Sequence, residues 1–130
     1  MRALDTGVLL GLLEGSVKVR ELLRRSRGAE LATTEANLLE LAVLCSRGPA
    51  KGRAARLAAL DKLRQRLTVL PLDGRAYHAA AAGIRGGAEL SWSTLGMLGA
   101  LEAAGCEELL TDDPRYGRGG WSFRVKVLTI

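Results

Sequence analysis

Short apolar runs alternate with longer amphipathic segments along the chain, and this alternation constrains the fold more than any other feature. Runs at about residues 2–5, 30–32, 68–70, 109–111 and 125–130 are typical of strands. Helices are expected between the first four, at about 8–15, 16–25, 34–45, 52–66, 74–85 and 91–105, and a loop at 117–120. Strands that alternate with helices indicate a mainly parallel sheet covered on both faces. The sequence therefore predicts an α/β fold, a three-layer α/β/α sandwich with a central sheet of about five strands.

The composition is typical of one folded domain. A chain of 130 residues can bury one ordinary core, and 48% hydrophobic with 25% charged residues argues against disorder. We therefore expect residues 1–130 to form a single domain. Asp5 and Glu14 interrupt any secretory leader, and no apolar run approaches the roughly 18 residues that span a bilayer. These features predict a cytoplasmic protein with no membrane association.

Acidic side chains stand where two of the predicted strands end. Asp5 and Thr6 follow the first strand, and Asp113 follows the fourth, just after Leu109–Thr111. The carboxyl ends of parallel strands meet at one crevice, so Asp5 and Asp113 are expected to lie close together. Glu40 sits within the apolar stretch of a predicted helix, where an unpaired carboxylate is costly to bury.

Three converging carboxylates predict a metal site. Carboxylates repel one another, and a divalent cation relieves that repulsion. Hard oxygen ligands with room for waters suit Mg²⁺ or Mn²⁺, and such an ion can activate water and neutralise charge on a phosphodiester. The net charge of +5 is compatible with a polyanionic substrate. The residues therefore lead to a nuclease hypothesis.

Three segments in this order resemble the PIN domain, a family of small metal-dependent ribonucleases that includes the VapC-type toxins. The segments are Leu4-Asp5-Thr6, Thr34 to Leu41, and Leu109 to Tyr116. The resemblance implies hydrolysis of RNA with Mg²⁺ or Mn²⁺. It makes Asp5, Glu40 and Asp113 the catalytic and metal-binding acids. Supporting positions are predicted at Thr6, Asn37, Ser93, Thr111 and Asp112.

One acidic position of the family departs from its pattern here. The family usually begins the helix before the last acidic strand with a pattern like Leu-Ser-x-x-Asp. The matching segment is residues 90–95, and Ser93 is predicted to occupy the acidic position. A hydroxyl is a neutral, weak ligand, so the site loses a negative charge. Glu89 or Asp112 could substitute, but Asp112 is expected to point away from the side of Asp113.

The resemblance also implies partners. A VapC-like protein would have a small antitoxin that enters the acidic crevice, and RNA is the expected substrate. A homodimer is predicted through an apolar seam formed by Leu9, Leu10, Leu12, Leu13 and Val17. Basic residues could guide RNA to the acids or simply be solvated helix faces, and both interpretations remain open; they are Arg20, Arg24, Arg25, Arg27, Lys51, Arg53, Arg56 and Arg64.

Other functional classes fit less well. Asp5-Thr6-Gly7 matches the triplet of aspartic proteases, but those enzymes have all-β folds. Haloacid dehalogenase phosphatases need a second Asp two residues after the first, where this chain has Gly7. The serious alternative is a catalytically degenerate PIN-like module that binds RNA or a partner protein, and Ser93 is its main support.

Overall fold

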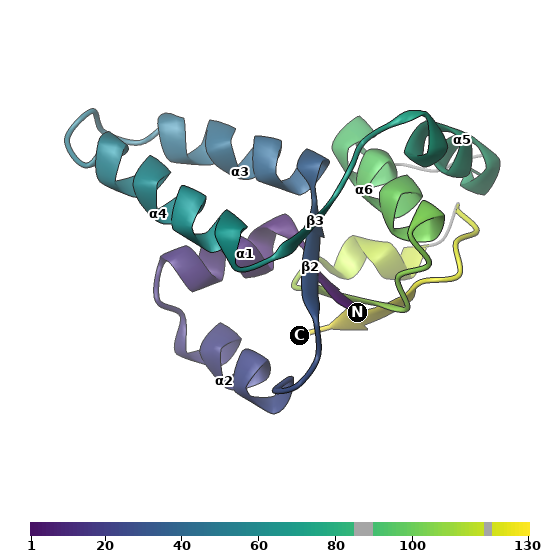
Figure 1. The fold of residues 1–130 in the computed structure, drawn as a ribbon, viewed down its shortest axis with the longest axis horizontal. Coiled ribbons are helices and arrows are strands. Elements are labelled where there is room, and N and C mark those ends of the chain that lie inside the picture. The colour runs from purple at the N-terminus through teal and green to yellow at the C-terminus, as the bar shows by residue number, and fades with distance from the viewer. Residues whose placement is uncertain (85–89, 119–120) are drawn as a thin grey trace.

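The computed structural model describes residues 1–84, 90–118 and 121–130, and its elements follow the predicted order (Figure 1). They are β1 (Arg2–Leu4), α1 (Thr6–Leu13), α2 (Val17–Arg25), β2 (Leu31–Thr34), α3 (Glu35–Ser46), α4 (Arg53–Gln65), β3 (Thr68–Leu70), α5 (Gly74–Gly83), α6 (Trp92–Ala103), β4 (Glu108–Thr111), the 3₁₀ turn η1 (Pro114–Arg118) and β5 (Lys126–Thr129). No helix in these ranges has the length and apolar character needed to cross a bilayer.

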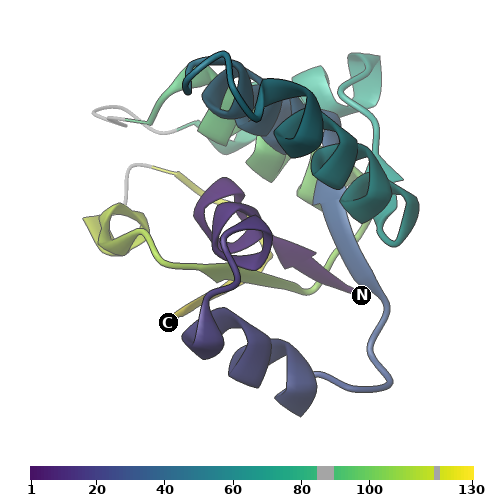
Figure 2. The ribbon, with the colours of Figure 1, turned by 90° about the vertical axis from the view of Figure 1, so that its left-hand side faces the viewer.

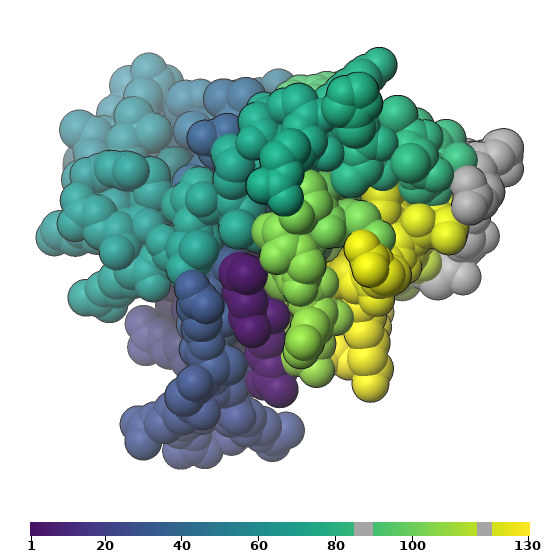
Figure 3. Space-filling view, turned by 45° about the vertical axis from the view of Figure 1, so that its right-hand side comes forward, coloured from purple at the N-terminus to yellow at the C-terminus, as the bar shows by residue number. Residues whose placement is uncertain are grey.

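The strands form one parallel sheet in the order β3-β2-β1-β4-β5. Ala3 of β1 pairs with Ala32 of β2 on one side and with Leu109 of β4 on the other. Segments far apart in sequence therefore lie side by side, as Figure 3 shows for the N-terminal, β2 and C-terminal regions. The predicted α/β fold with a five-stranded parallel sheet flanked by helices is confirmed.

Each face of the sheet carries its own hydrophobic core. Successive strand residues point to opposite faces, so Ala3 and Leu109 face one layer while Leu4 and Leu110 face the other. The first layer is formed by α5 and α6, and the second by α1, α2, α3 and α4. Figure 1 shows these two groups of helices on either side of the strands, and Figure 2 looks onto the side that carries α1 to α4. Burial on both faces explains why the strands are short apolar runs without polar alternation.

Side-chain caps fix where the helices begin. Ser16, Thr34, Asp73 and Ser91 each accept a hydrogen bond from the backbone N–H three residues ahead. Such caps satisfy one of the amides that a helix start leaves unpaired. Ser91 is the cap of α6, so the helix itself begins at Trp92.

Two local predictions are wrong at their edges. β2 extends through Thr33 and Thr34, both fully buried, whereas the apolar pattern placed its end at residue 32. β-Branched threonines fit a buried strand despite their hydroxyls, and the Thr33 hydroxyl donates to the backbone oxygen of Leu4. The predicted loop at 117–120 is replaced in its first half by the end of η1. Residues 119–120, and the predicted helix end at residue 85, lie outside the described residues.

One residue of the apolar seam predicted for a dimer, Leu9, is not available at the surface. Leu9 is fully buried in the chain's own core, and Leu10, Leu12 and Leu13 pack against that core in part. Val17 is exposed. The remaining residues of the predicted seam therefore stay partly or fully accessible.

One basic residue predicted as a possible RNA contact has a structural role instead. The Arg56 guanidinium donates to three backbone oxygens at the α3–α4 connection, those of Cys45, Lys51 and Pro49. The bond to Cys45 satisfies a carbonyl that the end of α3 leaves unpaired, and the other two bonds hold the segment that connects α3 to α4. Arg24 and Arg64 form ion pairs with acids on their own helices. Solvated helix faces therefore account for part of the basic charge.

Candidate active site

The topology brings Asp5 and Asp113 to neighbouring strand ends. Asp5 directly follows β1, and its backbone N–H donates to Leu110 of the adjacent β4 (3.0 Å). Asp113 lies two residues beyond β4, and Glu40 projects from α3 after β2. One cavity of about 230 Å³ lies among these segments, and its lining residues are Asp5, Thr6, Gly7, Glu40, Leu44, Ser91, Thr94, Asp112, Asp113, Arg115 and Tyr116. The three acids predicted from sequence thus border the same cavity.

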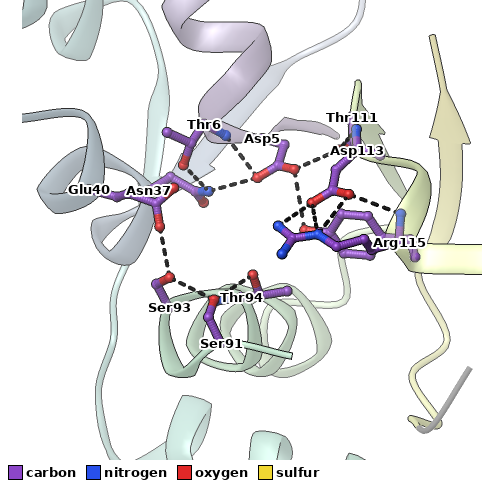
Figure 4. A network of polar contacts seen from close by, with 11 residues as sticks. Asp5, Thr6, Asn37, Glu40, Ser91, Ser93, Thr94, Thr111, Asp113 and Arg115 are labelled. Carbon is purple, nitrogen blue, oxygen red and sulfur yellow. Dashed lines mark hydrogen bonds and ion pairs between the residues drawn. The ribbon is translucent and has the colours of Figure 1, made fainter. Parts of the chain in front are cut away.

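Asp5 is held by hydrogen-bond donors on both carboxylate oxygens (Figure 4). Oδ1 accepts from the backbone N–H of Thr6 (2.8 Å) and from Nδ2 of Asn37 (3.3 Å). Oδ2 accepts from the hydroxyls of Thr111 (2.6 Å) and Tyr116 (3.2 Å). Burial nevertheless dominates and raises the pKa of Asp5, and the nearby Glu40 charge acts in the same direction. The four hydrogen bonds thus fix the orientation of the Asp5 carboxylate. Its burial makes the charged form less favourable than it would be in water.

Asn37 connects Asp5 to the helix that carries Glu40. Its side chain is buried, and Nδ2 donates to Asp5, to Oγ1 of Thr6 (3.1 Å) and to Sδ of Met97 (3.3 Å). Its Oδ1 accepts from the hydroxyl of Thr34, the α3 cap (2.7 Å). Asn37 therefore fixes the start of α3 against the end of β1, in keeping with its predicted supporting position.

We expect Asn37→Ala to lower the free energy of unfolding by about 1–3 kcal/mol, because it leaves buried donors and acceptors without partners. Chemical denaturation with urea measures this change. Gln65→Ala is the matched control, since it removes a side-chain amide that bonds to Asp61 at an exposed site. That variant should stay within about 0.5 kcal/mol of wild type. Equal losses in the two variants would contradict the role of Asn37.

Asp113 is paired with the nearby Arg115. The Arg115 guanidinium contacts both carboxylate oxygens through Nε (3.0 and 2.9 Å) and Nη2 (2.6 Å), and its backbone N–H donates to Oδ1 (2.9 Å). The hydrogen bonds to Asp113, and then its charge, raise the pKa of Arg115. The backbone N–H of Asp113 donates to Oγ1 of Thr111, which also bonds to Asp5. Thr111 therefore links the two acids, as its predicted supporting position requires.

Glu40 lies on the other side of the cavity and faces the start of α6. Its Oε2 accepts from the hydroxyl of Ser93 (2.7 Å), and Ser93 lies 3.0 Å from the hydroxyl of Ser91 (Figure 4). Ser91 donates in turn to Oγ1 of Thr94 (3.0 Å). A chain of hydroxyls therefore leads from Glu40 along the first turn of α6.

The structure separates the roles of Ser93 and Thr94. Thr94 lines the cavity beside Asp5, whereas Ser93 is not among the lining residues and bonds to Glu40. Counted from Leu90, the pattern Leu-Ser-x-x-Asp places its Asp position at Thr94, and this spacing is the signal that could have identified it. Thr94, with its neutral hydroxyl, therefore stands at the cavity wall where the family's acid is expected.

Two further residues were missed from sequence. Tyr116 donates to Asp5, and burial followed by the Asp5 charge raises the pKa of its phenol, so Tyr116 stays protonated as a donor. Arg115 was not assigned a role because a surface arginine after a strand is ordinary. The 3₁₀ turn η1 brings both side chains back to the end of β4.

Asp112 also borders the cavity, contrary to the expectation that it points away from Asp113. Its carboxylate lies against the Cα of Gly7 in the first turn of α1, where any added Cβ would collide with it. The absence of a side chain at Gly7 thus lets Asp112 approach the start of α1, where negative charge is favourable. Glu89, the other predicted substitute, lies outside the described residues.

The donor set can be tested against a divalent ion. Among the residues that the structure describes, no three His, Cys, Asp or Glu side chains converge closely enough to hold an ion as they stand. Mg²⁺, however, is commonly held by one or two carboxylates and completes its shell with waters. Asp5 and Asp113 supply hard oxygens, Glu40 and Asp112 add negative charge, and the cavity has room for waters. The residues therefore fit a hydrated divalent ion.

A family model for the PIN domain matches residues 2–118. The chain belongs to the PIN domain family. The resemblance seen in the sequence is thereby confirmed over most of the chain. No curated protein matches the sequence significantly.

Several solved structures share the fold. VapBC2 from Rickettsia felis, bound to a promoter DNA fragment, has a TM-score of 0.82 at 14% identity, covering 99% of this chain and 98% of that one. FitAcB from Neisseria gonorrhoeae has a TM-score of 0.82 at 17% identity, with coverages of 99% and 97%. VapC20 from Mycobacterium tuberculosis, a toxin that cleaves the sarcin-ricin loop, has a TM-score of 0.69 at 17% identity, with coverages of 97% and 99%. At these identities the likeness concerns the fold.

Proposed function

We propose that this PIN domain is a divalent-metal-dependent ribonuclease that acts as the toxin of a toxin–antitoxin pair. The main support for the proposal is that Asp5, Glu40, Asp112 and Asp113 all border the same cavity, at the carboxyl ends of β1 and β4. Acids from distant parts of the chain border this one cavity. Membership of the PIN family supports the same assignment.

In this proposal Asp5 and Asp113 hold Mg²⁺ or Mn²⁺, and Glu40 orients a water or helps to hold the ion. A bound divalent ion would neutralise charge on the phosphodiester and lower the pKa of water. Thr6, Asn37, Thr111 and Tyr116 keep Asp5 in place, and a fixed orientation of ligands lowers the cost of reaching the reactive geometry. Ser93 orients Glu40 through its hydroxyl.

Thr94 gives a direct test, because it leaves the cavity one negative charge short. We expect Thr94→Asp to increase cleavage of a labelled RNA in Mn²⁺ by about tenfold or more, since an added carboxylate strengthens ion binding and positioning. Rates are measured at limiting Mn²⁺ with a chelator blank. Ser93→Asp is the matched control: it adds the same charge one residue away, where the side chain meets Glu40 and not the cavity.

Ser93→Asp is expected to leave the rate unchanged or lower it, because its carboxylate would repel Glu40. Equal gains in both variants would mean that net charge alone acts. An increase in cleavage rate in Ser93→Asp alone would indicate that position 93, as predicted from the sequence, is the one where the family's acid is missing.

A second candidate is a degenerate PIN module that binds RNA without cleaving it. The neutral Thr94 and the pairing of Asp113 with Arg115 favour it. Purified protein that retains RNA at moderate salt but leaves it intact in Mn²⁺, even with Thr94→Asp, would establish this alternative.

As partners we propose a small antitoxin protein and a second copy of the same chain. We also propose a cytoplasmic location. An apolar hollow of about 400 Å³ between α1, α3 and α4 supports a protein partner, because such hollows suit apolar side chains; it is lined by Leu10, Leu13, Glu14, Leu44, Cys45, Gly48, Pro49, Ala55, Arg56 and Ala59. We take the whole chain, residues 1–130, as one domain in this proposal. Sedimentation of the purified protein tests the dimer.

A further inference from the structure

Arg115 forms an ion pair with Asp113, one of the two acids that would hold the proposed ion. Its guanidinium reaches both oxygens of Asp113 through three contacts of 3.0 Å or less. The pair lies on the border of the cavity that also contains Asp5. Figure 4 shows the Arg115 side chain lying directly against Asp113. The chain therefore places a cation of its own beside the acids.

This pairing conflicts with ion binding for two physical reasons. A carboxylate whose two oxygens accept a bidentate guanidinium has fewer lone pairs directed toward another cation. The guanidinium charge also repels a divalent ion at close range.

The pair is nevertheless easy to open. The side chain of Arg115 is 61% exposed, whereas that of Asp113 is 23% exposed. An exposed arginine can move into solvent with little loss of packing, and exposed ion pairs hold their partners by no more than about fivefold. Asp113 is carried by the end of β4 and by the bond from its N–H to Thr111, so it stays in place when Arg115 leaves.

We propose that Arg115 is an internal competitor of the divalent ion: it holds Asp113 while the site is free of metal and must swing away when the ion binds. This inference rests on the proposed function and deepens it, because it makes Arg115 the residue that sets the metal affinity of the site. The protein then binds its ion more weakly than its acids alone would allow.

Mn²⁺ binding to the purified full chain tests the competition, measured by isothermal titration calorimetry and by the electron paramagnetic resonance signal of free Mn²⁺. We expect Arg115→Gln to lower the Kd for Mn²⁺ by about two- to tenfold, from loss of the ion pair and of the repelling charge. Arg115→Lys keeps the positive charge but loses the bidentate guanidinium. Its Kd for Mn²⁺ should lie between those of wild type and Arg115→Gln.

Arg124→Gln is the matched control. Arg124 contacts Glu102 near the far end of α6, so its loss changes net charge equally while leaving the cavity intact. Its Kd for Mn²⁺ should equal that of wild type. Thermal melting in chelator confirms that each variant is folded.

The possible outcomes separate this inference from the proposed function. If wild type binds Mn²⁺ and the Kd of Arg115→Gln is unchanged or raised, the competition is overturned. The proposed metal site is still supported in that case. An equal fall in Arg124→Gln also overturns it, because bulk charge would then explain the effect. Absence of Mn²⁺ binding in wild type and in both Arg115 variants overturns the competition and the proposed metal site together.

Discussion

Asp5→Asn is expected to slow RNA cleavage by at least about a hundredfold while making the metal-free protein more stable. The loss of rate follows because a carboxamide cannot supply the negative charge that holds a divalent ion, and each factor of ten corresponds to about 1.4 kcal/mol of barrier. Cleavage of a labelled RNA in excess Mn²⁺ measures it. A variant that cleaves at the wild-type rate would remove Asp5 from the site.

The gain in stability follows from the raised pKa of Asp5, which burial causes. Between the unfolded pKa near 3.8 and the higher folded pKa, the folded state binds more protons than the unfolded state. The free energy of unfolding therefore falls as pH rises through this window, and the full penalty remains at neutral pH. The carboxamide of the variant carries no such charge, and the hydroxyls of Thr111 and Tyr116 can turn to accept from it.

Thermal melts in chelator between about pH 4 and pH 8 test this sign. The difference in Tm, Asp5→Asn minus wild type, should grow with pH and then level off. Added Mn²⁺ should stabilise wild type, since it binds the folded state, and should leave the variant unchanged. A difference that shrinks with rising pH would contradict a carboxylate destabilised by burial.

Gly99→Val is expected to lower the free energy of unfolding by about 4 kcal/mol or more. Gly99 lies in α6, where an added Cβ would collide with the backbone oxygen of Ala76 and crowd Ala80, both in α5. A backbone atom of a packed helix cannot rotate away as a side chain can, so the two helices must separate. Separation would expose the core between α5, α6 and the sheet.

Denaturation by heat measures the effect, and a drop in Tm of roughly 12 °C or more is expected for a domain of this size. Gly74→Val is the matched control, because an added Cβ at the start of α5 meets nothing within 4 Å. Its Tm should change by no more than a few degrees. Similar losses in both variants would mean that valine in a helix, and not the close approach of α5 and α6, determines the result.

The sequence predicted the positions that follow from the ends of strands. Asp5 and Asp113 could be paired because β1 and β4 are apolar runs that end abruptly, and parallel strands end at a common edge. Glu40 could be added because it interrupts an apolar helix stripe. These inferences depend on spacing along one element, which the sequence carries directly.

Features set by rotation about a helix or by a turn are less secure, because a small error along the sequence changes which side chain faces the site. Each residue along a helix turns the side chain by about 100°, so an error of one position exchanges Ser93 for Thr94 and the Glu40 side for the cavity. Arg115 and Tyr116 reach the site because of the turn η1. The sequence did not indicate this turn, because the glycines at 117, 119 and 120 are typical of a loop.

The proposed ion site can be examined in a crystal grown or soaked with Mn²⁺ and measured at an anomalous wavelength. We expect an anomalous peak in the cavity at the ends of β1 and β4, bonded to Asp5 and Asp113, with Arg115 turned into solvent. A crystal of the folded protein at saturating Mn²⁺ with Asp113 still paired to Arg115 and no peak beside Asp5 would contradict it.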